Sequence, residues 1–202
     1  MLKNLILLLT PPADAGKLCT AIGRMMIARY EGLGPRGIVN VNGVPTVFPY
    51  ICPTGHPTLG RGIVISFDEY NKLKDVGIPL KQAELDFKKE VDMFSREVAA
   101  LIKVPTTDWE FDSLVSLAYN IGIANLKSST LLRKLNLKDY AGAAAEFPKW
   151  VYGNHVKLPG LVTRREAEQR MFLNTPPRPV LVDDKVMNIL ARKDHLQELM
   201  AA

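Results

Sequence analysis

The chain has little cysteine and no long apolar run. Its 202 residues include only two cysteines, too few for the disulfide framework of a small secreted protein, and this count fits a chain made in a reducing compartment. The apolar run at residues 5–9 is shorter than the roughly 7–15 residues of a signal-peptide core. It is also far shorter than the ~20 residues that a helix needs to span a bilayer. We therefore expect residues 1–17 to form an N-terminal arm, with no signal peptide.

Basic residues are not clustered with aromatic ones, and we find no internal repeat or low-complexity segment. The formal net charge of +5 and the pI near 9.2 indicate an anionic partner, such as a membrane surface or an acidic cell wall. Without a basic and aromatic patch, nucleic acid is the least supported partner. The cysteines and histidines lack the spacing of a metal site, so we predict no metal and no cofactor.

Apolar periodicity predicts several helices. The first spans about 18–30, with Ile22, Met25 and Met26 on its buried face and Gly32 ending it. Asn42-Gly43 lies between β-forming residues and predicts a two-residue hairpin. The chain should then form short strands near 58–62 and 63–67. Further helices are expected over 80–104, 108–122, 130–136, 140–147 and 163–172, the last opened by a capping box at Thr163 and Glu166. A loop is expected at 150–155. Beyond a Pro-rich linker, a final helix is expected over 183–200.

Reactive side chains are concentrated in residues 50–62. Cys52, Thr54, His56 and Thr58 fall within seven residues, and the glycines that follow allow a backbone to approach a ligand closely. Upstream, Glu31 stands at the end of the first helical run, half covered by apolar neighbours. A carboxyl group in such a position is suited to general acid catalysis.

Three blocks in this order resemble the phage-type lysozymes, glycoside hydrolase family 24. They are residues 28–32 with 50–62, 111–122 with 129–136, and 158–168, and together they cover roughly 20–173. The resemblance implies an α+β, lysozyme-like fold over residues 18–173. A small β-hairpin lobe and a larger helical lobe would flank the active-site cleft. The hairpin at about 33–49 would be an insertion, because the family separates Glu31 and Cys52 by fewer positions.

The resemblance also implies a function and a set of site residues. It implies an endolysin-like muramidase that hydrolyses the β-1,4 bond between N-acetylmuramic acid and N-acetylglucosamine in peptidoglycan during host lysis. Glu31 would be the acid, Cys52 the second catalytic group and Thr58 the residue that holds the attacking water. Asn120 and Arg164 would bind substrate. The protein would be a monomer, made in the host cytoplasm and acting on the wall after release.

Several alternatives stay open at this point. The family often has Asp where this chain has Cys52, so the sulfur would be a base, a nucleophile or a spacer. A lone glutamate also suits a lytic transglycosylase, and the C-terminal helix suits a non-enzymatic protein that binds the wall or perturbs an anionic membrane. A thiol hydrolase would pair Cys52 with His56, His155 or His195. Arg165 competes with Arg164 for the position facing the cleft.

Overall fold

The structure is a computed structural model that describes residues 14, 16–153 and 155–173. Most of the N-terminal arm predicted for residues 1–17 lies outside these residues. The linker and the C-terminal helix predicted within 174–202 lie wholly outside them. Within the described part of the chain, no helix combines the length and the apolar character needed to cross a bilayer.

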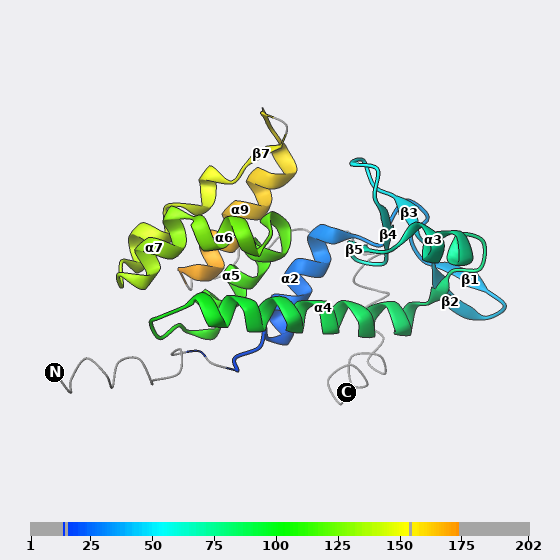
Figure 1. The fold of residues 1–202 in the computed structure, drawn as a ribbon, viewed down its shortest axis with the longest axis horizontal. Helices are drawn as coiled ribbons and strands as arrows, with labels where there is room; N and C mark the ends of the chain where they lie inside the picture. The colour runs from blue at the N-terminus through cyan, green and yellow to red at the C-terminus, as the bar shows by residue number, and fades with distance from the viewer. Residues whose placement is uncertain (1–13, 15, 154, 174–202) are drawn as a thin grey trace.

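Two lobes of unequal size make up the fold, as the α+β prediction requires (Figure 1). The helices are α2 (Ala21–Glu31), α3 (Phe67–Leu73), α4 (Leu80–Leu101), α5 (Asp108–Ile121), α6 (Ile123–Ser128), α7 (Thr130–Asn136), α8 (Tyr140–Ala144) and α9 (Pro159–Phe172), with a 3-10 turn η1 (Phe147–Lys149). The strands are β1 (Val39–Val41), β2 (Val44–Val47), β3 (Tyr50–Ile51), β4 (Pro57–Leu59), β5 (Ile63–Val64), β6 (Ile78–Pro79), β7 (Tyr152–Gly153) and β8 (Val156–Lys157). They pair antiparallel as β1-β2-β6, β3-β4-β5 and β7-β8.

The long helix α4 runs beneath both lobes (Figure 1). Its 22 residues correspond to about 33 Å. Near its start, Ala83 packs in a small core with Val47 and Leu59 of the β lobe. Further along, Phe87 and Val91 enter the larger core of the helical lobe. One amphipathic helix therefore sets the spacing of the two lobes.

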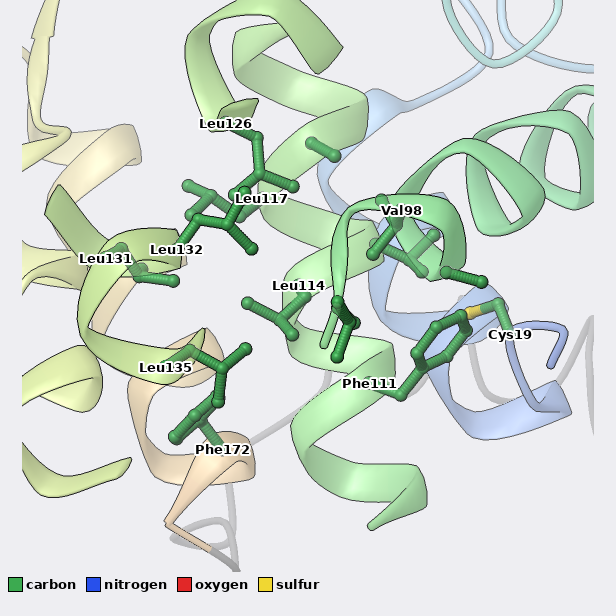
Figure 2. Packing of buried hydrophobic residues seen from close by; sticks show 14 of the residues in the cluster. Cys19, Val98, Phe111, Leu114, Leu117, Leu126, Leu131, Leu132, Leu135 and Phe172 are labelled. Atoms are coloured by element: carbon green, nitrogen blue, oxygen red, sulfur yellow. The ribbon is translucent and has the colours of Figure 1, made fainter. Parts of the chain in front are cut away.

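Helix α5 is the centre of the larger core. It begins with a capping box in which the Thr107 and Glu110 side chains each bind the other residue's backbone N–H, and it ends at Gly122. Its apolar side chains, such as Phe111 and Leu114, are fully buried. Figure 2 shows them between α4 and the start of α2 on one side and α7 and α9 on the other. This position brings α5 against both helices that carry the predicted site.

The β lobe confirms the predicted hairpin. Asn42 and Gly43 have φ values of 50° and 84°, and Val41 pairs with Val44 across the turn. Both turn residues occupy the left-handed region that such a two-residue turn requires. The strand expected over 63–67 ends earlier, at Val64, because Ser66 caps α3 by accepting a hydrogen bond from the backbone of Glu69.

The face of α2 that packs on the core differs from the prediction. Ile22 and Met25 are 50% and 60% exposed, whereas Gly23 and Ile27 are buried. Gly23 lacks a side chain where α2 meets Asp112 of α5, so the helices approach closely along that line. The predicted buried face of α2 is therefore wrong. Apolar spacing could not indicate the contact through Gly23, because glycine has no apolar side chain.

Three local predictions in the C-terminal half also need correction. The helix expected from Thr163 begins earlier, at Pro159, which suits the first helical position. The Thr163 hydroxyl donates to the Pro159 carbonyl inside the helix, so it is not a cap. The loop expected at 150–155 contains strand β7, and α6 was not predicted.

We predict that Gly23→Ala destabilises the fold. A Cβ at Gly23 would lie 2.5 Å from both Asp112 Cγ and Cys19 Sγ. Overpacking of this kind should lower the free energy of unfolding by about 1–3 kcal/mol, measured by urea denaturation. Gly160→Ala is the matched control, because a Cβ there meets nothing within 4 Å, and its stability should be unchanged or slightly higher. Equal stability of the two variants would contradict the close α2–α5 contact.

Candidate active site

Glu31 lies at the junction of the two lobes. It is the last residue of α2, and Gly32, with φ of 61°, turns the chain away from the helix. Its side chain is 19% exposed, and its Oε1 accepts a hydrogen bond from Arg164 Nη1 at 2.6 Å. On the other side, a Cβ built on Gly62 would lie 3.1 Å from Glu31 Oε2. The carboxylate is therefore held between α9 and the turn that joins β4 to β5.

Arg61 fixes this β4–β5 turn to three helices. Its Nη1 donates to the Ala28 carbonyl of α2 at 2.8 Å, and its Nη2 pairs with Glu84 of α4 at 2.8 Å. Its own carbonyl accepts a hydrogen bond from the Tyr119 hydroxyl of α5 at 3.0 Å. The sequence analysis missed this role. The signal was a single charged residue between two glycines in the reactive stretch.

Cys52 lies in a tight turn after β3. Its backbone N–H donates to the His56 carbonyl at 2.9 Å, and its carbonyl accepts from Gly55 N–H at 2.8 Å. Its Sγ is 3.0 Å from Thr54 Oγ1. The hydrogen bond with the Thr54 side chain, helped by backbone contacts at His56 and Thr54, lowers the pKa of the Cys52 thiol to about 7. A substantial fraction is therefore thiolate near neutral pH.

Thr58 lies on the central strand of the β3-β4-β5 sheet, opposite Tyr50. It is only 4% exposed, and its hydroxyl donates to the His56 carbonyl at 3.1 Å. The same carbonyl accepts from the Cys52 backbone N–H, and Thr58 helps to lower the pKa of the Cys52 thiol. The structure thus brings together two of the predicted catalytic residues, Cys52 and Thr58.

The charges of Cys52 and Glu31 both act on Tyr50 of β3. Burial raises the pKa of Tyr50, and the negative charges of Cys52 and Glu31 raise it further. No hydrogen bond among the described residues joins Glu31 directly to Cys52 or Thr58.

Arg164 is buried, at 3% exposure, and all its nitrogens are engaged. Besides Glu31, it contacts Glu168 Oε1 through Nε and the Ser116 carbonyl through Nη2, both at 3.1 Å. Of the two candidate arginines, Arg164 is the one that contacts the predicted acid, whereas Arg165 is fully buried and pairs with Glu168. Binding of substrate by Arg164 stays a prediction.

Asn120 is exposed near the end of α5. Its Oδ1 accepts a hydrogen bond from Arg165 Nη2 at 3.2 Å. This contact anchors one edge of the amide and links Asn120 to the same charged group as Arg164. Its predicted contact with sugar is not tested by this geometry.

Glu168 was missed by the sequence analysis. It is fully buried on α9, and its Oε1 accepts hydrogen bonds from Ser116 Oγ at 2.7 Å, Arg164 Nε at 3.1 Å and Arg165 Nη2 at 3.0 Å. Its Oε2 is 3.0 Å from Arg165 Nε, without hydrogen-bond alignment. Burial raises the pKa of Glu168, and the two guanidinium groups oppose this. The available signal was its spacing of three and four residues from the two arginines.

Other sequence alternatives find little geometric support. The hydrogen bond between Cys52 and His56 joins backbone atoms, not the thiol and the imidazole. Both cysteines are free thiols, and burial raises the pKa of Cys19. The described residues contain no group of three or more potential metal ligands from Cys, His, Asp and Glu. A hollow between β4, β5 and α4 is lined by Leu59, Ile63 and Ala83 among others, and it includes none of the predicted catalytic residues.

We predict that alkylation distinguishes the two thiols. In the native protein, iodoacetamide should modify Cys52 with a rate that rises through a midpoint near pH 7, because the thiolate is the nucleophile. Cys19, at 2% exposure, should react only after unfolding. Thr54→Val should move the Cys52 midpoint towards the ordinary thiol value. A native midpoint that this substitution leaves in place would contradict the role of the Thr54 hydroxyl. Peptide mass spectrometry measures both sites.

Comparison with known proteins gives one consistent result. Residues 30–168 match the family model described as phage lysozyme. An endolysin from Acyrthosiphon pisum secondary endosymbiont phage 1 is 38% identical over 154 residues, which are 74% of this chain and 94% of that protein. The structure of an endolysin from Escherichia coli O157:H7 phage FAHEc1 has a TM-score of 0.64 and 31% identity, covering 79% of this chain and 96% of that one. A mutant of P22 lysozyme has a TM-score of 0.63 and 27% identity, covering 77% of this chain and 98% of that one. This chain belongs to the phage lysozyme family.

Proposed function

We propose that this protein is an endolysin that hydrolyses the β-1,4 bond between N-acetylmuramic acid and N-acetylglucosamine, with Glu31 as general acid. The family makes the chain a lysozyme-type glycosidase, with peptidoglycan as its substrate. The observation that carries the assignment of the acid is the position of Glu31. Its carboxyl group lies between Arg164 and Gly62, where the two lobes meet.

The chemistry of bond cleavage gives Arg164 a role beside the acid. Glu31 would donate its proton to the glycosidic oxygen as the bond to the anomeric carbon breaks. Negative charge then develops on the Glu31 carboxylate. Arg164, at 2.6 Å from Oε1, stabilises this charge without having to move.

Cys52 would supply the second group as a thiolate. With its pKa near 7, the sulfur carries substantial negative charge at neutral pH. This favours the roles of base and nucleophile over that of spacer. Thr58 donates to the same His56 carbonyl as the Cys52 backbone N–H and would hold a water molecule near the sulfur. Residues 183–200 lie outside the described residues, so their contact with an anionic membrane stays a prediction. The monomeric state also stays a prediction.

A second activity, lytic transglycosylation, is favoured by the replacement of a second carboxylate by Cys52. The two reactions share the acid and differ in what attacks the anomeric carbon. Hydrolysis leaves reducing N-acetylmuramic acid ends, whereas transglycosylation leaves anhydro ends. Mass spectrometry of digested peptidoglycan distinguishes them, and we expect reducing ends.

Glu31→Gln should abolish most of the activity. Loss of a general acid should slow the lysis of purified peptidoglycan by about 100-fold or more in a turbidity assay. Glu166→Gln is the control, because its side chain lies on the exposed face of α9 and is 56% exposed. It should lyse peptidoglycan at the wild-type rate. If Glu31→Gln were as active as this control, with both variants folded by circular dichroism, Glu31 would not be the acid.

Replacement of Cys52 tests the thiolate. Cys52→Asp should keep activity and extend it to lower pH, because an aspartate stays ionised down to about pH 4 whereas the thiol is protonated below about pH 7. Cys52→Ala should lose most of the activity at every pH. The measurement is the rate of peptidoglycan lysis between pH 4 and 9. A wild-type rate and profile in Cys52→Ala would remove the sulfur from the mechanism.

A further inference from the structure

We propose that Glu168 is a positioning residue for the acid Glu31 and acts on it through Arg164. The inference rests on the proposed role of Glu31. The side chain of Glu168 is fully buried, so it cannot contact a substrate directly. Its influence on the reaction must therefore pass through the residues that it contacts.

The contacts form a continuous series from the core to the acid. Ser116 Oγ donates to Glu168 Oε1 at 2.7 Å, and Arg164 Nε donates to the same oxygen at 3.1 Å. Arg164 Nη1 then donates to Glu31 Oε1 at 2.6 Å. A guanidinium group is planar, with its donors in a fixed arrangement. Once Glu168 and the Ser116 carbonyl hold Nε and Nη2, the direction of Nη1 is set as well.

Charge makes Glu168 necessary during the reaction cycle. Arg164 and Arg165 are 3% and 0% exposed, so water compensates neither cation. Glu31 is neutral before it donates its proton and negative afterwards, so it balances Arg164 for only part of the cycle. Glu168 contacts both arginines and takes no part in the proposed proton transfer. A buried cation without a partner is strongly unfavourable, so Glu168 keeps Arg164 in place when Glu31 is protonated.

Four charged residues joined by contacts determine the charge balance around Arg164, and the nearby tyrosines are neutral. Tyr30 of α2 lies under Arg164, with its ring centroid 5.4 Å from the guanidinium carbon, and it faces Glu168. The charge of Glu31 acts on Tyr119 of α5 and on Tyr50 of β3. Burial raises the pKa of all three tyrosines, so they are neutral near pH 7. The charged groups in contact are Glu31, Arg164, Arg165 and Glu168.

Glu168→Gln removes the charge and keeps the shape of the side chain. We expect kcat on soluble peptidoglycan fragments to fall about tenfold, with KM within about twofold, because the acid is misplaced while the sugar groove is intact. The alkaline limb of the kcat–pH profile should also move to lower pH. Arg164, no longer shared with Glu168, would favour loss of the proton from Glu31.

Glu146→Gln is the matched control for loss of a buried carboxylate. Glu146 is 4% exposed and pairs with Lys134 at 2.7 Å and Lys149 at 2.8 Å, away from the proposed site. It should lower stability while leaving kcat and the pH profile at wild-type values. Equal kcat values and superimposable profiles for Glu168→Gln and Glu146→Gln would overturn the proposal.

A second pair of variants covers a failure of Glu168→Gln to fold. The double variant Glu168→Gln, Arg165→Met removes one charge of each sign from the interior. Proteins often tolerate the replacement of both members of a buried ion pair. It should have a kcat about tenfold below that of Arg165→Met alone, and equal kcat values would overturn the proposal. Full activity of Glu31→Gln would instead overturn the proposed function. An inactive Glu31→Gln beside a Glu168→Gln variant of wild-type kcat and profile would overturn only the inference made here.

Discussion

The ion pair between Arg164 and Glu31 is the contact on which the site depends. It joins the end of α2 to the first half of α9, two segments separated by 133 positions in the sequence. Tyr30 adds to this junction through its ring beneath the guanidinium group and its hydroxyl near the Thr163 carbonyl. Because α2 leads directly into the β lobe, its attachment to α9 also fixes where that lobe begins.

A second constraint holds the β lobe against the acid. The turn at Arg61 is fixed to α2, α4 and α5, so Gly62 cannot move far from Glu31. Gly62 has φ of 89° and lies so close to the carboxylate that a Cβ there would reach 3.1 Å from it. The backbone conformation therefore favours glycine, and a side chain at this position would also crowd Glu31. These contacts hold the β lobe against the helical lobe, so that residues from both lobes lie around Glu31.

The sequence revealed those parts of the site that depend on local pattern. Glu31 was recognised at a helix end, and the Asn42-Gly43 hairpin and the long helix α4 follow from turn chemistry and apolar spacing. Arg61 and Glu168 could not be recognised in this way, because their meaning lies in partners far along the chain. The buried face of α2 was likewise set by a glycine contact with α5, which tertiary packing decides and local periodicity does not record.

The charged residues buried beside the acid are unusual for a protein core, where ionised side chains are seldom fully buried. Arg165 is fully buried, its Nη1 has no hydrogen-bond partner among the described residues, and burial lowers its pKa to about 10. Apolar residues of similar volume often stabilise such a position more than an ion pair does. A planar guanidinium held on two sides presents its third side in one direction only. The burial of Glu168 between two arginines thus fixes the orientation of Arg164 and of the Nη1 donor that meets Glu31.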